Sequence, residues 1–470
     1  MDIFPRRAER THSVRDIVAD YSSLSKEELE ARPLSVVVPG RIMSVRRMGR
    51  ATFFHISDGR ARLQAYLREE SVGPELYKRF SLLDIGDVLS VRGRLFKTKT
   101  GELTVQAESF TFLAKCLHPL PEKWHGLQDV ELRFRRRYLD LIMNPEVGET
   151  FRLRSALIRR LRSFFDERGY VEVETPMMQP IPGGALAKPF KTFHNALGLD
   201  LYLRIAPELY LKRLVVGGLE RVYEINRNFR NEGISSEHNP EFTMLEFYQA
   251  YSDHEELMGL TEELIVTLAR ELLGGEELCF GPHRISLARP WKRLKFREAV
   301  ESSSGLAPGK FDDPRAVIGL AADLAPDNPP TTLGKALDTL FDKMVKPSLI
   351  QPTFVLGHPR EISPLAKMSP DNPEEAERFE LIMAGMEMAN AFSELTDPAD
   401  QRRRFEEQVA DRAKGDEESH PLDNDYITAL EYGLPPTAGE GIGIDRLAML
   451  FSGRTSIREV ILFPLLRPKP

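Results

Sequence analysis

The sequence predicts a large α+β domain built on an antiparallel sheet and preceded by a small β-barrel, and two observations lead to this fold class. Residues 33–116 contain short apolar strands separated by turn signals, at roughly ten-residue spacing, with one helical patch. From residue 148 onwards, amphipathic helices alternate with strands over long separations, and two strand pairs show period-two alternation. The first pattern is typical of a small barrel, and the second of a sheet with two different faces.

Composition limits the kind of protein this is. The chain has 470 residues, of which 41% are apolar, so it can bury large cores in two or three domains. Its only cysteines, Cys116 and Cys279, form no CxxC motif, which argues against a disulfide scaffold and favours a reducing compartment. The N-terminus is charged, and no run approaches the ~20 apolar residues of a membrane span. We therefore expect a soluble, cytoplasmic protein with no membrane contact.

The barrel, expected over residues 33–117 and of the OB type, concentrates basic and aromatic residues. Between Pro33 and Cys116 there are 14 Lys and Arg against 8 Asp and Glu, a balance of +6 within a chain of net charge −7. Single-stranded nucleic acids are held by cations that track phosphates and by rings that stack on bases. Phe53 and Phe54 are adjacent on one strand, so one should face the core and the other outward. A solvated basic face would give the same charge balance.

The remaining segments follow from composition. Residues 1–32 form a short N-terminal segment, 118–147 a linker and 148–470 the main domain, with a helical insertion around 284–349 that shows little recognisable chemistry. The linker ends in a basic run, Arg133, Arg135, Arg136 and Arg137. Contacts with a phosphate backbone and salt bridges to protein carboxylates explain this run equally well.

The most informative segment is a hairpin predicted within residues 222–248. Its even positions are mostly polar or aromatic, whereas the odd ones include apolar residues. The even positions are Val222, Glu224, Asn226, Asn228, Arg230 and Glu232 in the first run and Phe242, Met244, Glu246 and Tyr248 in the second. The intervening loop carries Glu237 and His238. An ordinary sheet turns such a face to water, but a guanidinium, carboxylates and aromatic rings together also suit an anionic, planar ligand beside a cationic one.

Two further segments carry unusual chemistry. The apolar hairpin RFELIMAGMEMANAFSEL, residues 378–395, is interrupted by Glu380, Glu387, Asn390 and Glu394. Unpaired carboxylates are costly to bury, so a divalent cation shared by Glu380 and Glu387 and an ammonium at Glu394 would explain them; a solvated strand face is the alternative. The strand TAGEGIGI enters a helix that has Arg446 in its first turn, and its alternate glycines clear one face for a flat ligand.

These segments together resemble the class II aminoacyl-tRNA synthetases. FRNEGISSEHNPEFTMLEFY, residues 229–248, looks like the second signature motif of bacterial-type lysyl-tRNA synthetases. GYVEVETPMM, residues 169–178 with Pro176, resembles the first motif, and GEGIGIDRLAMLF, residues 439–451, resembles the third. The similarity runs from the barrel to VILFPLLRP at the end of the chain. Three motifs in order over that length make the resemblance specific.

The resemblance implies a function and a set of partners. A class II catalytic domain would activate L-lysine with ATP to lysyl-adenylate and transfer the lysyl group to the 3' end of tRNA(Lys), with Mg²⁺ as cofactor and as a homodimer. Catalysis would rest on Arg230, His238 and Arg446, without a nucleophilic side chain. A relative that lysylates a protein lacks the barrel, and a non-catalytic nucleotide or tRNA sensor would not need these residues; both remain alternatives.

Individual positions carry over from the family as expectations. ATP would be bound by Arg230, Glu232, His238, Asn239, Phe242 and Arg446, and Mg²⁺ by Glu380 and Glu387. Lysine would be bound by Gly184, Glu208, Arg230, Glu246, Tyr248, Asn390, Phe392 and Glu394. The anticodon, rich in uridine, would be read by Arg46, Phe53, Gln64 and Glu102.

The residues themselves favour lysine among amino acids. Glu246 and Glu394 beside Tyr248 and Phe392 suit a long apolar stem that ends in an ammonium, and a neutral amino acid would leave the carboxylates unpaired. Ornithine, one methylene shorter, is harder to reject, since a methylene is worth roughly 1–3 kcal/mol. Three residues depart from common family forms: Ala389 and Ala391, which we expect to narrow the floor near Asn390, and Glu440 in the glycine-rich strand.

Overall fold

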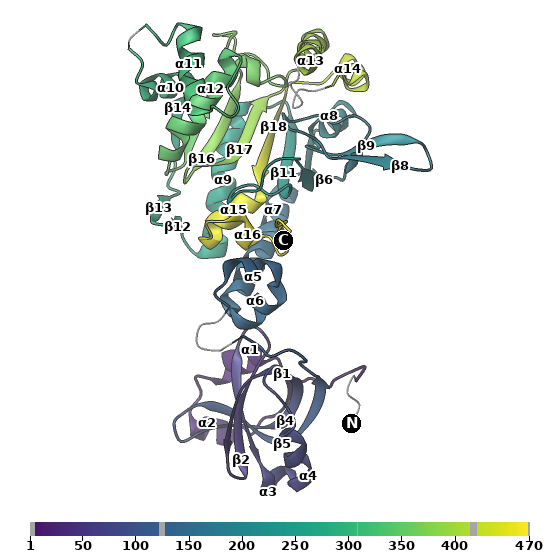
Figure 1. Cartoon of the computed structure of the whole chain (residues 1–470), viewed down its shortest axis with the longest axis vertical. Coiled ribbons are helices and arrows are strands. Elements are labelled where there is room, and N and C mark those ends of the chain that lie inside the picture. Colours follow the sequence, from purple (N-terminus) through teal and green to yellow (C-terminus); the bar gives the residue numbers. More distant parts are fainter. Residues whose placement is uncertain (1–4, 122–126, 308, 414–420, 469–470) are drawn as a thin grey trace. The chain divides into compact units, whose positions relative to one another are not determined.

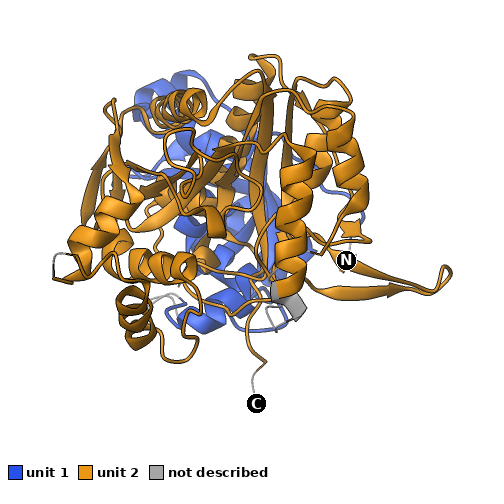
Figure 2. Ribbon diagram, turned by 90° about the horizontal axis from the view of Figure 1, so that it is seen from above, with its two compact units in different colours: residues 1–149 blue, residues 150–470 orange. Residues whose placement is uncertain are grey.

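The chain folds into two units that divide between residues 149 and 150 (Figure 2). A computed structural model describes residues 5–121, 127–307, 309–413 and 421–468. Those parts of the predicted segments 1–32, 118–147 and 148–470 that fall on other residues lie outside the described ranges. None of the described helices combines the length and the hydropathy that a membrane span requires.

The predicted barrel is confirmed. Its strands are β1 (Ser35–Met48), β2 (Ala51–Ser57), β3 (Arg62–Arg68), β4 (Val88–Lys97) and β5 (Leu103–Ala114), closed in the order β1-β2-β3-β5-β4. Helices α3 (Glu69–Val72) and α4 (Pro74–Phe80) form the expected helical patch. Phe54 is buried in the barrel core, whereas Phe53 is only half-buried on the outer face, as their adjacency predicts.

The N-terminal segment belongs to the barrel unit. It forms α1 (Val14–Tyr21) and α2 (Lys26–Ala31), and each begins with a capping box, at Ser13 and Ser25 respectively. Val14, Ile17 and Leu29 are buried in the same hydrophobic cluster as the barrel strands. The N-terminal segment is therefore part of the hydrophobic core of the barrel unit.

The predicted linker is largely helical. It contains α5 (Val130–Arg135) and α6 (Arg137–Met143). Within it, Asp140 accepts hydrogen bonds from Arg133 at 2.8 Å and from Arg137 at 2.6 Å. Arg135 binds Glu131 one turn away at 2.8 Å. Salt bridges within the unit therefore account for three of the four arginines of the basic run.

An eight-stranded sheet forms the second unit (Figure 1). Its order is β14 (Lys292–Lys295), β15 (Thr353–Leu356), β16 (Arg378–Met383), β17 (Met386–Ser393), β18 (Thr437–Gly443), β11 (Glu241–Ala250), β10 (Arg221–Phe229) and β6 (Val171–Glu172). Only the outermost pairs, β14 with β15 and β10 with β6, are parallel. The predicted α+β class with a large antiparallel sheet is thus confirmed.

One face of this sheet carries the main hydrophobic core. Helices α7 (Pro145–Asp166), α9 (His254–Leu273) and α15 (Ile444–Ser452) contribute to it. The odd positions of the predicted hairpin, among them Tyr223, Leu245 and Phe247, are fully buried there. The even positions face the other side, because strand residues alternate between faces.

The hairpin of β10 and β11 has the predicted shared face. Glu224 pairs with Glu246, Asn226 with Met244 and Asn228 with Phe242, so the polar and aromatic residues of both strands align. Strand β10 ends at Phe229, so Arg230 and Glu232 lie in the connecting loop rather than in the strand. Glu224, Asn226 and Asn228 are buried, which excludes the interpretation of this face as solvated sheet surface.

The insertion expected around 284–349 begins later than predicted. Residues 277–286 form a small sheet of β12 (Glu277–Phe280) and β13 (His283–Ser286), and β14 belongs to the main sheet. The helical part consists of α10 (Phe296–Ser304), α11 (Pro314–Leu324), α12 (Leu333–Leu340) and a π-helical turn, Phe341–Val345. These pack around a hydrophobic cluster that also includes Val355 and Ile382 of the main sheet. The short strands β13 and β14 were missed because their own residues, HRIS and KRLK, are mostly polar or charged.

The remaining elements flank the sheet. Helix α8 (Glu208–Val216) is followed much later in the chain by α13 (Pro398–Ala413), α14 (Asn424–Glu431) and α16 (Ile457–Val460). A three-stranded sheet contains β7 (Met178–Gln179), β9 (Leu199–Leu203) and β8 (Lys191–His194), and its β8-β9 hairpin extends outward from the unit (Figure 1).

Candidate functional site

A cavity of about 390 Å³ lies on the polar face of the large sheet. It collects residues from segments far apart in the sequence. Of the side chains predicted for ATP, Mg²⁺ and lysine, those lining the cavity are Gly184, Glu208, Arg230, Glu232, His238, Asn239, Phe242, Glu246, Tyr248, Glu380, Glu387, Asn390, Phe392 and Arg446. Of all the residues predicted for these three ligands, only Glu394 is not part of the cavity lining.

The glycine-rich strand β18 runs along the floor of the cavity. Gly441 is paired with Glu246 on one side and with Asn390 on the other, and Gly439 is paired with Tyr248 and Phe392. A Cβ atom on Gly439 would lie 2.2 Å from Tyr248 Cε1 and 2.5 Å from Glu394 Oε1. The glycine at position 439 therefore makes room for side chains of this chain, and not only for a flat ligand as the sequence suggested.

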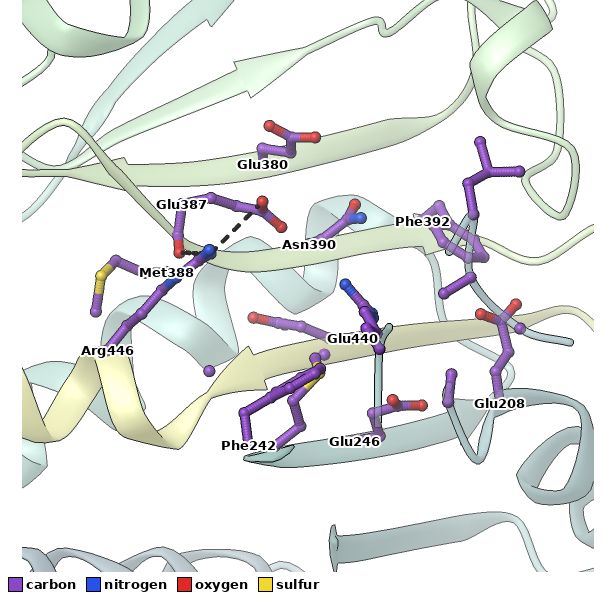
Figure 3. A pocket seen from close by; sticks show the side chains of 18 of the residues that line it. Glu208, Phe242, Glu246, Glu380, Glu387, Met388, Asn390, Phe392, Glu440 and Arg446 are labelled. Atoms are coloured by element: carbon purple, nitrogen blue, oxygen red, sulfur yellow. Dashed lines mark hydrogen bonds and ion pairs between the residues drawn. The ribbon is translucent and has the colours of Figure 1, made fainter. Parts of the chain in front are cut away.

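One end of the cavity gathers Arg446, His238 and Glu387, and Figure 3 shows Arg446 reaching Glu387 from the start of α15. The Arg446 guanidinium donates to the Glu387 carbonyl at 2.6 Å and lies 3.4 Å from His238 Nε2. Ser235 holds the other ring nitrogen of His238 at 2.9 Å. Burial and the neighbouring Arg446 lower the pKa of His238, so the imidazole is neutral near pH 7.

Arg230 and Phe242 form the middle of the cavity. The Arg230 guanidinium lies over the Phe242 ring at 5.0 Å, and its buried Nε has no hydrogen-bond partner among the described residues. A buried donor of this kind is costly unless a ligand satisfies it. Asn239 is held by the backbone of Glu241 and Leu465, whereas Glu232 is exposed at the rim.

A β-bulge brings the carboxylates of β16 and β17 to one face. Leu381 pairs with Ala389 but Ile382 pairs with Glu387, so Met388 is the extra residue. Because the bulge shifts the alternation, Glu387 joins Asn390 and Glu380 on the cavity side, although its odd number would place it on the opposite face. Figure 3 shows the three side chains along these neighbouring strands.

Arg378 organises this group and was missed by the sequence analysis. It donates to Glu380 at 2.6 Å and to Asn390 at 3.0 Å. Burial and the adjacent Glu387 nevertheless raise the pKa of Glu380 to about 8. The pKa of Glu387 is lowered: burial acts to raise it, but Arg446, Lys346 and Arg378 outweigh that effect.

The insertion also contributes to the cavity, contrary to the expectation that it carries little chemistry. Asp338, Asp342 and Lys346 line the cavity near Glu387. Lys346 is paired with Asp342 at 2.9 Å. Burial raises the pKa of Asp338 to about 6, with a further contribution from Asp342. These residues follow helix periodicity, so nothing in the local sequence distinguishes them from surface charges.

The other end of the cavity holds buried carboxyl groups. Glu208 stands at the first position of α8, Glu246 projects from β11, and Glu394 follows β17; all three are buried. Tyr248 donates to Glu246 at 3.5 Å. Burial and the neighbouring Glu208 and Glu224 raise the pKa of Glu246 to about 8.

Lys212, which the sequence analysis overlooked, changes the expectation for Glu394. Its fully buried ammonium lies 2.6 Å from Glu208 Oε1 and forms an ion pair with Glu394 Oε2. Glu394 is not itself among the residues that line the cavity: its Oε2 pairs with Lys212, and its Oε1 lies against Gly439, which does line it. A signal was present, since Lys212 follows Glu208 by four residues within an apolar helix.

The departures from family forms lie on the opposite face of the sheet. Ala389 and Ala391 are buried in the main hydrophobic core, so the expectation that they narrow the floor near Asn390 is wrong. Glu440 is buried on that same side, where it pairs with Thr261 of α9 at 2.7 Å. Period-two alternation turns these side chains toward the core helices, although Glu440, as a residue of the floor strand β18, is also among the residues that line the cavity (Figure 3).

The barrel face brings the predicted anticodon residues together. Phe53 pairs with Arg46 on β1 and stacks on Tyr66 of β3 at 4.4 Å. Gln64 donates to Glu102 at 2.8 Å and accepts from Thr104 at 2.9 Å. His55, next to this group, lies 3.0 Å from Glu102. This face of the barrel thus presents the half-buried ring of Phe53 together with the Gln64 amide and the Glu102 carboxylate, which hydrogen bonds hold in place.

Comparison with known proteins defines the class. The family model described as tRNA synthetases class II (D, K and N) matches residues 129–467, and the model described as OB-fold nucleic acid binding domain matches residues 36–113. The chain belongs to the class II tRNA synthetases of this D, K and N family.

Individual relatives narrow the comparison further. A lysine–tRNA ligase of Pelotomaculum thermopropionicum is 56% identical over 98% of this chain and 91% of its own length. The lysine–tRNA ligase of Carboxydothermus hydrogenoformans is 54% identical over 98% and 93%, and that of Bacillus subtilis 49% identical over 100% and 94%.

Proposed function

We propose that this chain is a lysine–tRNA ligase, which activates L-lysine with ATP to lysyl-adenylate and transfers the lysyl group to the 3' end of tRNA(Lys). The observation that carries the proposal is the group of buried carboxyl groups at one end of the cavity, with Glu246 on its wall. Buried carboxylates accept a cationic substrate and penalise a neutral one that leaves them unpaired. An acidic substrate would require a cation where Glu246 stands.

Lysine binding follows from this arrangement. Glu208 and the backbone at Gly184 take the α-ammonium, and Arg230 and Asn390 take the carboxylate. Gly184 has φ of +90°, and a Cβ there would lie 3.0 Å from Glu208 Cβ, so only glycine lets the loop approach. The aliphatic stem lies along Tyr248 and Phe392, and the ε-ammonium reaches Glu246 and Glu394.

The chemistry relies on positioning and charge. The lysine carboxylate attacks the α-phosphate of ATP in line, and pyrophosphate leaves; the terminal ribose hydroxyl of the tRNA then attacks the carbonyl of lysyl-adenylate, the acyl–phosphate bond breaks, and AMP leaves. Arg230 stabilises the charge that develops on the α-phosphate, while Arg446 and His238 bind the departing phosphates. Phe242 stacks under the adenine, beside Glu232 and Asn239.

Mg²⁺ fits the carboxylates of β16 and β17. Hard cations prefer oxygen ligands, and two carboxylates plus substrate phosphates are a common Mg²⁺ site. Burial and the neighbouring Glu387 raise the pKa of Glu380, so a cation bound between the two carboxylates would favour the ionised form of Glu380. The described residues contain no group of three or more His, Cys, Asp or Glu side chains suited to a metal, so the phosphates would have to complete the shell. Bound there, Mg²⁺ would neutralise phosphate charge.

The barrel supplies tRNA recognition. Phe53 stacks on an anticodon base, Gln64 and Glu102 read the polar edges of uridine, and Arg46 binds the backbone. This module favours tRNA over a protein as the acceptor of the lysyl group. The cavity, in turn, fits a catalytic enzyme better than a nucleotide sensor, because it contains Arg230, Arg446, Glu380 and Glu387.

A cytoplasmic homodimer is the assembly we propose. The first motif runs from the edge strand β6 to the first residue of β7. Its Val171, Met177 and Met178 are exposed, and so is Phe193 on the projecting β8-β9 hairpin. An apolar group at a sheet edge is typical of an interaction surface. Light scattering at micromolar concentration should give twice the chain mass.

Pyrophosphate exchange tests the function. Each of the twenty amino acids is supplied with ATP and labelled pyrophosphate, and only lysine should drive rapid exchange. Charging of a lysine tRNA transcript then tests the second step. If another amino acid drives exchange better than lysine, or if none does, the proposed function is wrong.

A further inference from the structure

Lys212 occupies a position that the proposed chemistry leaves unexplained. It lies one helical turn after Glu208 on α8, and its side chain is 0% exposed. Its Nζ contacts Glu208 Oε1 and Glu394 Oε2, and it lies 5.3 Å from the ring centroid of Phe392 and 6.0 Å from that of Tyr426. A buried ammonium is tolerated only with such partners, so the pairing is built into the fold.

Each carboxylate keeps one oxygen that Lys212 does not use. Glu394 Oε1 is buried without a hydrogen-bond partner in the described part of the chain. It lies against Gly439, which lines the cavity beside Tyr248. Glu208 lines the cavity itself, near Gly184. The two carboxylates that would receive the two ammonium groups of lysine are therefore tied to one another through a single internal cation.

Building on the proposed function, we infer that Lys212 is a positioning residue that joins the α-ammonium and ε-ammonium subsites and fixes the distance between them. By holding one oxygen of Glu208 and one of Glu394, it aims the other oxygen of each at the substrate. The separation of the subsites then selects a side chain of four methylenes. Ornithine, with three, can satisfy only one of the carboxylates at a time.

The charges agree with this role. Burial raises the pKa of Glu208, Glu246 and Glu394, and Lys212 opposes that effect at Glu208 and Glu394. When all three carboxyl groups are ionised, Lys212 balances one, and two remain for the two ammonium groups of lysine. Burial acts to lower the pKa of Lys212, but Glu208 and Glu394 more than offset it, so Lys212 stays charged. Tyr426 and Tyr248 are the other titratable groups around Glu394, and burial raises the pKa of both, which keeps them neutral.

The test compares lysine with ornithine in pyrophosphate exchange by the full-length protein. Lys212→Met removes the charge but keeps the length of the side chain. We expect the ratio of kcat/KM for lysine to kcat/KM for ornithine to fall by at least about tenfold, within the 10–200-fold that a single methylene can supply. Arg213→Met is the matched control, because Arg213 is the next residue on α8 and pairs with Asp423 at 2.8 Å. Its ratio should equal that of the wild type.

Loss of stability alone would lower both kcat/KM values equally and leave their ratio unchanged, so the ratio separates positioning from folding. A wild-type ratio in active Lys212→Met overturns the inference. If Lys212→Met does not fold, Glu394→Gln is compared with Lys212→Met/Glu394→Gln, in which the buried carboxylate is neutral. Equal ratios in that pair, both below the wild type, support the inference; a wild-type ratio in Glu394→Gln overturns it. A wild type without lysine-dependent exchange would instead overturn the proposed function.

Discussion

The two ends of the cavity hold charge in different ways. At the end with Arg446 and Glu387, these side chains are 20% and 32% exposed, whereas at the end with Lys212 and Glu394 both side chains are 0% exposed. Figure 3 shows Arg446 and Glu387 at one side of the group and Glu208 and Phe392 at the other. The two ends of one cavity therefore differ in how far water reaches their charged side chains.

Solvent access explains the division. An open end with several cations can bind and release a phosphate group, because water screens the charges when the ligand leaves. A closed end cannot tolerate an unmatched charge, because desolvation makes each unpaired carboxylate costly. We therefore assign catalysis to the open end and selection of the amino acid to the closed end.

The largest expected effect comes from the middle of the cavity, where both ends meet. Arg230→Ala should reduce lysine-dependent pyrophosphate exchange by at least about 100–1,000-fold, since this is the effect of removing one donor that stabilises transition-state charge. Arg227→Ala is the control, because Arg227 is exposed on the same hairpin and outside the cavity. Near-normal exchange in Arg230→Ala would remove Arg230 from the chemistry.

A second prediction concerns the open end. Glu387→Gln should raise the Mg²⁺ concentration needed for half-maximal exchange by about 10–100-fold, comparable to the loss of a partner of a metal ligand. The KM for lysine should change little, because Glu387 lies at the other end of the cavity. A Mg²⁺ titration at saturating lysine and ATP measures the effect, and an unchanged midpoint would contradict the proposed metal site.

A third prediction uses pH at the closed end. With the pKa of Glu246 near 8, the free protein carries this group protonated at pH 6, and lysine must expel that proton to bind. The KM for lysine should therefore fall up to about tenfold per pH unit between pH 6 and 8, and level off above pH 8. The groups facing Glu246 are Glu208, Glu224, Tyr248, Arg204 and Arg230.

Glu246→Gln provides the control for this pH profile. The variant should have a higher KM for lysine that no longer depends on pH in this range. If the wild-type KM for lysine is flat from pH 6 to 8, Glu246 is already ionised before lysine binds, and the closed end is less sensitive to charge than we propose.

The smallest effect is expected for Glu440 on the neighbouring strand β18, whose carboxylate contacts α9 on the opposite face of the sheet. Burial raises the pKa of Glu440 to about 8, so the folded protein favours the protonated form. Its contribution to stability is complete below the unfolded pKa, is lost as pH rises to the folded pKa of about 8, and changes no further above it. Glu440→Gln should therefore gain at least about 1 kcal/mol in free energy of unfolding relative to the wild type between pH 5 and 9.

In contrast to its stability, the kinetics of Glu440→Gln should not change. Its KM for lysine and its exchange rate should match the wild type, because the Glu440 carboxylate accepts its hydrogen bond from Thr261 of α9 and the backbone of β18 is unchanged. Denaturant unfolding at several pH values measures the stability difference. A large kinetic effect would show that the two faces of β18 are coupled.

Much of the architecture could be predicted from local pattern. Period two in the hairpin of β10 and β11 predicted which residues share a face, and adjacency predicted that Phe54 enters the barrel core while Phe53 does not. The insertion was placed too early, because the short strands β13 and β14 are too polar to stand out. Asp338, Asp342 and Lys346 could not be assigned to the cavity, because helix periodicity does not reveal what a helix packs against.

The sequence by itself determined the class of fold, the shared polar face of the hairpin and the glycine-rich floor, since strand alternation is a local property of the backbone. Only the tertiary structure decided that Glu387 joins Asn390, because a bulge at Met388 reverses the alternation there. It also decided the partner of Glu394, because the ion pair with Lys212 spans 182 residues of chain, from position 212 to position 394. Which charge meets which depends on packing between distant elements, and local pattern carries no record of that.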